Sequence, residues 1–134
     1  MVKIRVAIGS ENGVDIDNSH LGDIARFYLY DIDKDGNIEP VEYRDNPYQK
    51  MDHAGDNKMN KILSILKDVH VLIARQKSPN FRRIASKTKY QPVIIKKTSV
   101  DKSLETVARN FKEIKALVDK RTAKEISEEI PTYE

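Results

Sequence analysis

Asp31-Ile-Asp-Lys-Asp-Gly-Asn-Ile-Glu-Pro-Val-Glu42 can fold in two incompatible ways, and the architecture of the whole chain depends on which of them forms. One is the calcium-binding loop of an EF-hand, which lies between two helices. The other is a β-hairpin, whose two strands would belong to a sheet.

The calcium alternative depends on ligand spacing. Carboxylates stand at loop positions one, three, five and twelve, an amide at position seven and a glycine at the sharp turn in position six: Asp31, Asp33, Asp35, Glu42, Asn37 and Gly36. An entering helix is available, because Leu21, Ile24, Ala25 and Tyr28 follow helical spacing. However, Asn46-Pro47 would stop an exiting helix after about one turn.

The hairpin alternative pairs two segments that are rich in β-favouring residues. Phe27 to Ile32 would form the first strand and Asn37 to Tyr43 its antiparallel partner, with Lys34-Asp35-Gly36 as a three-residue loop. Gly36 would then adopt the left-handed conformation, Ile32 would lie opposite Ile38, and Leu29 opposite Val41. We favour the hairpin, because the rest of the chain is not wholly helical, and keep calcium binding as the alternative.

Composition indicates a globular domain of ordinary kind. The chain has 134 residues, 39% hydrophobic and 34% charged, so we expect a single domain over residues 1–120 and a charged, fraying tail over 121–134. The formal charge of +3 is too weak to indicate nucleic acid as a partner. No apolar run approaches membrane-spanning length, so we expect no membrane association and a cytoplasmic location. The absence of cysteine excludes disulfides and thiolate ligands.

Outside the hairpin, the hydrophobic pattern alternates between strands and helices. Strands are expected at residues 2–8, 69–74 and 91–96. Helices are expected around Met59 to Leu66, after Ser78-Pro79, and as one long helix from Ser99 to Val118. The resulting order β-β-β-α-β-α-β-α predicts a mixed five-stranded α/β sheet with the first strand in the middle and helices on both faces.

Ligands in such sheets bind beyond the carboxyl ends of the parallel strands. Here the loop of residues 9–22 leaves the first strand, and the loop of residues 75–80 leaves the strand of residues 69–74. We therefore expect a crevice that contains His20, Arg75, Lys77, Ser78 and Asn80. By contrast, His53 is expected in a solvated loop, and His70 at a strand entrance is expected to be structural.

Several short motifs in this order resemble the dinitrogenase iron-molybdenum cofactor biosynthesis family, which includes the NifX and NafY carriers and the C-terminal part of NifB. The likeness covers roughly residues 3–118. Its parts are the first strand, Ser19-His20-Leu21-Gly22-Asp23 where the family has a sequence like Ser-Glu-His-Phe-Gly-Arg, the aromatic strand with its Asp-Gly turn, and the strand that ends in Asn46-Pro47.

The resemblance implies a ribonuclease-H-like fold and a non-catalytic carrier of an anionic iron-sulfur or iron-molybdenum cluster or its precursor. It implies a cofactor-binding role for His20 and Gly22. The family's Gly-Gly-Ile-Gly-Pro-Asn loop is replaced here by Arg75-Gln-Lys-Ser-Pro-Asn80. Arg75 and Lys77, beside a helix N-terminus, would still attract an anion.

Three functions therefore remain open at this point. The first is the cluster carrier, whose partners would be metallocluster assembly or acceptor proteins, and which would be a monomer or a weak homodimer. The second is the calcium-binding protein. The third is a ligand-free regulatory or protein-interaction module of the same fold. Catalysis is not expected, because the sequence offers no paired nucleophile and base and no Walker loop.

Overall fold

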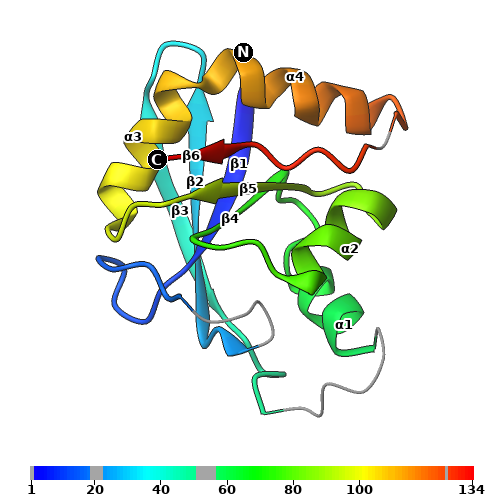
Figure 1. Ribbon diagram of the computed structural model, residues 1–134. Helices are drawn as coiled ribbons and strands as arrows, with labels where there is room; N and C mark the ends of the chain where they lie inside the picture. The colour runs from blue at the N-terminus through cyan, green and yellow to red at the C-terminus, as the bar shows by residue number, and fades with distance from the viewer. Residues whose placement is uncertain (1, 19–22, 51–56, 126) are drawn as a thin grey trace.

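A computed structural model of the chain describes residues 2–18, 23–50, 57–125 and 127–134 (Figure 1). The described residues form a mixed sheet of six strands and four helices: β1 (Lys3–Gly9), β2 (Arg26–Asp33), β3 (Ile38–Asp45), α1 (Asn57–Ile65), β4 (Val71–Ala74), α2 (Pro79–Lys87), β5 (Gln91–Ile95), α3 (Val100–Arg109), α4 (Phe111–Thr122) and β6 (Thr132–Tyr133). The strand order is β3-β2-β1-β4-β5-β6. None of the helices in the described part of the chain combines the length and the apolar character that crossing a bilayer requires.

The aspartate-rich segment forms the predicted hairpin. β2 and β3 pair antiparallel, and the Asp33 amide donates to the Asn37 carbonyl across the predicted three-residue loop, at 3.1 Å. Gly36 has a φ of +85°, in the left-handed region. Because strands flank this loop on both sides, the helix–loop–helix arrangement of an EF-hand does not form.

The predicted register is correct at one end of the hairpin and wrong at the other. Ile32 lies opposite Ile38, as predicted, whereas Leu29 lies opposite Glu42 instead of Val41. The register shifts between Leu29 and Tyr30, where Tyr30 pairs with Pro40. Proline cannot donate a ladder hydrogen bond and is tolerated at bulges and on edge strands, and β3 is the edge strand here.

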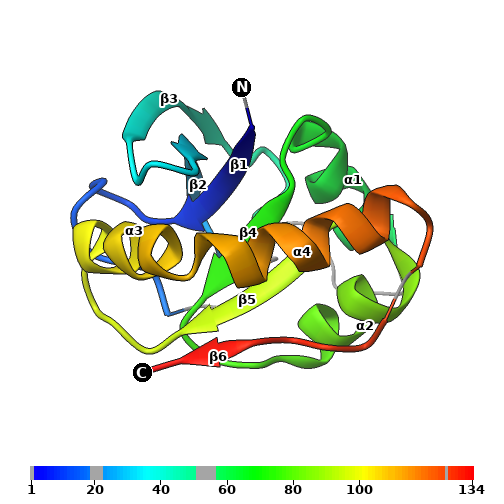
Figure 2. The same ribbon diagram turned by 90° about the horizontal axis from the view of Figure 1, so that it is seen from above.

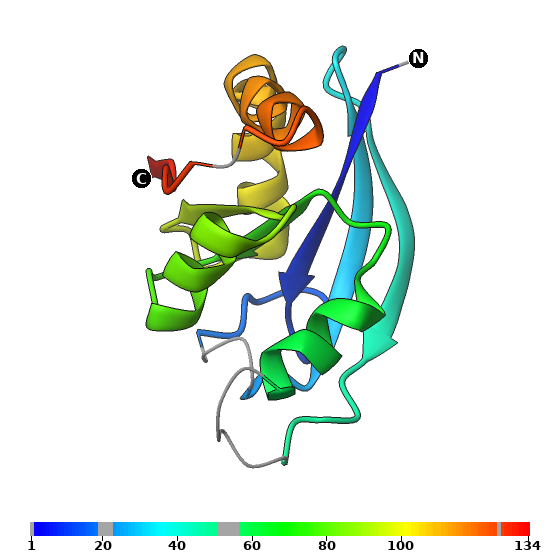
Figure 3. The ribbon, with the colours of Figure 1, turned by 90° about the vertical axis from the view of Figure 1, so that its right-hand side faces the viewer.

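The predicted central position of β1 is confirmed. It pairs antiparallel with β2 and parallel with β4, and β4 pairs parallel with β5. Alternating side chains of β1 enter two hydrophobic clusters: Ile4, Val6 and Ile8 face α3 and α4, whereas Ala7 faces α1 and α2. Helices therefore cover both faces of the sheet, as predicted (Figure 3).

The single long helix predicted from Ser99 to Val118 is wrong, because it breaks at Asn110. The two parts run in succession across the sheet as α3 and α4 (Figure 2). The Asn110 side chain donates to the Thr106 carbonyl at 2.8 Å, and its backbone lies at φ −109° and ψ 22°. A side chain that bonds its own backbone competes with helix propagation, which explains the break at asparagine.

The expected fraying tail instead holds the end of α4 and a sixth strand. β6 adds parallel to β5, and the Ile94 and Lys96 amides donate to the Pro131 and Tyr133 carbonyls, each at 2.9 Å. Arg121 is 4% exposed and donates to the Ser127 carbonyl at 2.9 Å, which fixes the segment before β6. The sheet therefore has six strands where five were expected.

Candidate functional site

The loops that follow β1 and β4 meet at the carboxyl end of these strands, as the topology predicts. β1 and β4 are parallel neighbours, so the chain leaves the sheet at the same end after each of these two strands. The Gln76 side-chain amide donates to the Asn18 carbonyl at 3.3 Å and joins the two loops directly. The residues that the sequence places around a crevice therefore originate from adjacent segments.

The loop after β1 is held by its own polar side chains and by the start of α3. The Ser10 hydroxyl donates to the Asp15 carbonyl at 2.6 Å and accepts from the Gly13 amide at 2.9 Å. The Val100 amide, in the first turn of α3, donates to the Val14 carbonyl at 2.8 Å. Gly13 has a φ of +77°, so the loop needs glycine there. This part of the candidate site is thus preorganised.

Behind the two loops the structure is closely packed. A side-chain carbon on Gly9, the last residue of β1, would lie 2.5 Å from Ile24 Cδ1. The cavity bordered by Gly9, Ile24, Ser78 and Phe81 has a volume of about 10 Å³, which is room for about one water molecule. A metal cluster is much larger than this cavity and cannot enter it.

The structure brings four of the predicted residues together at the N-terminus of α2. Ser78 is buried, and its hydroxyl accepts from the Phe81 amide at 3.2 Å as the helix cap. Its main role is therefore structural. Lys77 is exposed, whereas Arg75 and Asn80 are partly buried. His20 and Gly22, and also His53, lie outside the described residues, so their predicted roles stay predictions.

Arg75 has a buried donor that finds no acceptor among the described residues. Its Nε is shielded from solvent there and has no hydrogen-bond partner in that part of the chain. A buried donor that is left unpaired costs free energy of about 1–3 kcal/mol, and the cost is larger for a charged group. An anion placed beside Arg75 would supply the missing acceptor, so this observation fits the predicted anion-binding role.

A second feature at this edge was not predicted. A hollow of about 490 Å³ is lined mostly by acidic and amide side chains: Glu11, Asn12, Asp15, Ile16, Asp17, Asp23 and Gln49. The acidic residues are visible in the sequence, but the folded chain brings the lining together from three segments, residues 11–17, Asp23 and Gln49. Carboxylates at this hollow disfavour an anionic ligand there.

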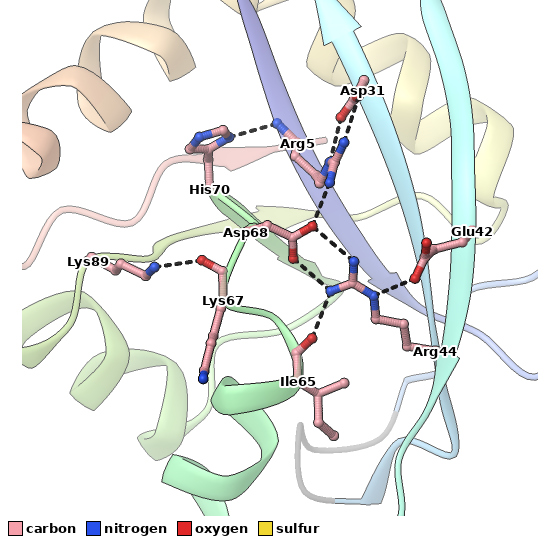
Figure 4. A network of polar contacts seen from close by, with 9 residues as sticks. All are labelled: Arg5, Asp31, Glu42, Arg44, Ile65, Lys67, Asp68, His70 and Lys89. Carbon is pink, nitrogen blue, oxygen red and sulfur yellow. Dashed lines mark hydrogen bonds and ion pairs between the residues drawn. The ribbon is translucent and has the colours of Figure 1, made fainter.

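Three of the four carboxylates of the calcium alternative, Asp31, Asp33 and Glu42, bind protein groups instead. Arg5 donates to both oxygens of Asp31, at 2.8 and 3.1 Å, and lowers the pKa of that carboxyl (Figure 4). Asp33 accepts from the Asn37 side chain at 3.0 Å, which lowers its pKa as well. Glu42 accepts from Arg44 at 2.8 Å. The described residues contain no group of three or more histidine or carboxylate side chains placed to hold a metal ion.

The same polar network includes His70 and accounts for its position at the start of β4. Asp68 accepts from both Arg5 and Arg44, so it connects β1 and β3 to the turn before β4 (Figure 4). His70 Nδ1 accepts from the Arg5 amide at 2.9 Å. Burial, followed by the nearby charge of Arg5, lowers the pKa of His70. This contact with β1 fits the prediction that His70 is structural.

Comparison with known proteins identifies one family. The family model described as dinitrogenase iron-molybdenum cofactor matches residues 2–110, which is well over half of the chain. The match runs from β1 to the junction of α3 and α4, and it includes both loops of the candidate site. A search of curated proteins found no match.

Proposed function

The chain belongs to the dinitrogenase iron-molybdenum cofactor family, and from this membership we propose that it is a non-catalytic carrier of an anionic iron-sulfur or iron-molybdenum cluster or precursor. It would act in the cytoplasm and exchange this cargo with metallocluster assembly or acceptor proteins. We also assign its sheet to the ribonuclease-H-like class. An antiparallel hairpin beside β1, followed by two parallel strands, supports that assignment.

The family match is the observation that carries this proposal, and the loop geometry supports it. The cargo would bind outside the sheet, where Arg75 and Lys77 precede the positive N-terminal end of α2. The unpaired Nε of Arg75 would donate to a sulfide or carboxylate oxygen of the cargo. Because the chain has no cysteine, the cluster would keep its own sulfides, and His20 would be its protein ligand.

An open site of this kind suits a carrier. A carrier must release its cargo, so it needs contacts that give moderate affinity and fast exchange. Arg75 and Lys77 in the loop after β4 would supply such contacts together with His20, whereas the cavity behind the loops is too small to enclose a cluster. The acidic side chains of the neighbouring hollow would disfavour an anionic cargo on that side.

Anaerobic reconstitution tests the proposal. Purified protein is mixed with an isolated iron-molybdenum cluster, passed through a desalting column, and examined for retained visible absorption. The unmodified protein should retain the chromophore, and His20→Ala and Arg75→Ala should each retain much less. Lys87→Ala is the matched control, because Lys87 is an exposed cation at the opposite end of α2.

Two results would overturn the carrier proposal. One is that the unmodified, folded protein retains no chromophore from either an iron-molybdenum or an iron-sulfur cluster. The other is that Lys87→Ala lowers retention as much as Arg75→Ala does, which would indicate non-specific attraction. Circular dichroism of each variant shows whether the fold is intact.

A further inference from the structure

A groove on the other side of the molecule carries a concentrated positive charge. It has a volume of about 520 Å³ and lies between the tip of the β2–β3 hairpin and the junction of α3 and α4. In Figure 1 the hairpin tip and this junction reach the same end of the molecule. We call it the α4 groove, and its lining residues are Lys34, Ala108, Arg109, Phe111, Lys112, Lys115, Ala116 and Asp119.

The cations of the α4 groove are largely unneutralised. Of the described residues that line it, Asp119 alone is acidic, and it forms an ion pair with Lys115 one turn away on α4. Lys34, Arg109 and Lys112 have no ion pair in the described part of the chain. These three cations come from three different elements, so the fold, and not one charged run of sequence, brings them together.

Apolar side chains line the α4 groove beside its cations. They are Ala108, Phe111 and Ala116, and Phe111 is 8% exposed. A lining that combines apolar side chains with cations complements a segment that carries acidic side chains around an apolar one. We propose that the α4 groove docks an acidic peptide segment of a partner protein.

Charge distribution favours a peptide over a nucleic acid. The positive surface is short, because exposed carboxylates follow within one turn on each helix, at Glu105 on α3 and Glu113 on α4. A long polyanion would meet these carboxylates outside the groove. The exposed residues that line the groove include no aromatic ring on which a base could stack, since Phe111 is buried. A peptide of a few residues meets neither obstacle.

The α4 groove also differs from a site for a small anion. Its cations surround a volume that falls in the range of sites for much larger ligands. A peptide with spaced carboxylates can pair with Lys34 on the hairpin and with Arg109 and Lys112 on the helices together.

This docking surface deepens the proposed function, and it rests on that function for the identity of the partner. A cluster carrier must contact the protein that supplies or accepts its cargo. The α4 groove would bind that partner through its acidic segment, while the loops after β1 and β4 keep the cargo accessible. The groove uses none of the residues proposed for cargo binding.

Fluorescence anisotropy with a defined probe tests the docking surface on protein without cargo. The probe is a fluorescein-labelled decapeptide of glutamate and aspartate around one phenylalanine, and the reference is its amide counterpart of glutamine and asparagine. The test variant is Lys34→Glu with Lys112→Glu. Glutamate is acceptable at both positions, because Lys34 lies in an exposed turn and Lys112 in the first turn of α4, where acidic residues are favoured.

The matched control is Lys50→Glu with Lys87→Glu, which changes the net charge equally at exposed positions away from the groove. We expect the acidic probe to bind more tightly than the amide probe. The affinity for the acidic probe should fall roughly tenfold in the test variant at low ionic strength, and less than about threefold in the control.

Three outcomes would overturn the docking surface. They are an acidic probe that binds no better than the amide probe, an equal loss of affinity in test variant and control, and a single-stranded DNA decamer that binds the groove more tightly than the peptide. None of these outcomes concerns cluster retention, because all measurements use protein without cargo. Conversely, failure of the reconstitution experiment leaves these affinities unchanged, so the two proposals can fail separately.

Discussion

Arg121→Met should destabilise the protein by removing the group that joins three elements. Arg121 Nε donates to Gln91 Oε1 at 2.7 Å, Nη1 to the Thr88 carbonyl at 2.8 Å, and Nη2 to the Ala85 and Ser127 carbonyls at 3.0 and 2.9 Å. These acceptors belong to the C-terminal end of α2, the start of β5 and the segment before β6. The guanidinium is almost fully buried, and burial lowers its pKa.

The magnitude follows from the acceptors that lose their donor. A hydrogen bond to a charged group contributes about 1.5–3 kcal/mol, and Arg121 makes four. The free energy released when a buried charge is removed offsets part of this, since such a charge is costly to desolvate. Methionine fills a similar volume, so no large cavity adds to the loss. We expect a net loss of about 3 kcal/mol, or roughly 10 °C in Tm for a domain of this size.

Urea unfolding followed by circular dichroism measures the free-energy change, and amide hydrogen exchange locates it. The Ile94 and Lys96 amides bond the β6 segment, so they should lose protection in Arg121→Met before the amides of β1 do. Arg109→Met is the control, because Arg109 is exposed, and it should change stability by less than about 0.5 kcal/mol. A loss below about 1 kcal/mol, or full protection of Ile94 and Lys96, would show that Arg121 does not hold the tail.

Three further predictions concern the polar network and the candidate site. Arg44 and Arg5 lower the pKa of Asp68, so the stability that this carboxylate contributes is present above its unfolded pKa near 3.8 and is lost as pH falls through the folded value. Asp68→Asn should reduce this loss of stability at acid pH, measured by urea unfolding. The variant should also cost about 1 kcal/mol of unfolding free energy at neutral pH, allowing for solvent screening. The lowered pKa of His70 makes stability depend on pH in a second range. The contribution of neutral His70 to the free energy of unfolding is complete above about pH 6.5 and declines below it. Unchanged stability between pH 5 and 8 would contradict this prediction. Gly9→Ala should lower the free energy of unfolding by about 1–3 kcal/mol, because the new Cβ would meet Ile24. Ile24→Val removes the nearest atom, Cδ1. The double variant should therefore lose less stability than the sum of the two single variants.

Local chemistry explains why the hairpin was predictable. An Asp-Gly turn between two segments rich in β-favouring residues restricts the backbone within a few residues, and the structure shows the expected three-residue loop with Gly36 in the left-handed region. The N-terminus of α2 was predictable for the same reason, since Ser78 and Pro79 determine it by a hydroxyl cap and a preset φ. The meeting of the loops after β1 and β4 followed from the connection rules of parallel strands.

The errors occur where two local preferences compete. In β3, the register set by the three-residue loop predicts Val41 opposite Leu29, but Pro40 cannot donate to the ladder and the strand forms a bulge there. In the helical segment after Ser99, the apolar spacing continues through Asn110, whereas the Asn110 side chain bonds the Thr106 carbonyl and ends α3. The periodicity of apolar residues does not indicate which preference prevails.

From its order of residues alone, this chain specified its hairpin turn, the start of α2 and the central place of β1, because these follow from backbone restrictions and from the connection rules of parallel strands. Tertiary structure decided the rest. The burial of Arg121, the acidic hollow near Asp15 and the cationic α4 groove each require side chains from three separate segments to meet. Their energies depend on distances between those segments, which exist only after the helices have packed on the sheet.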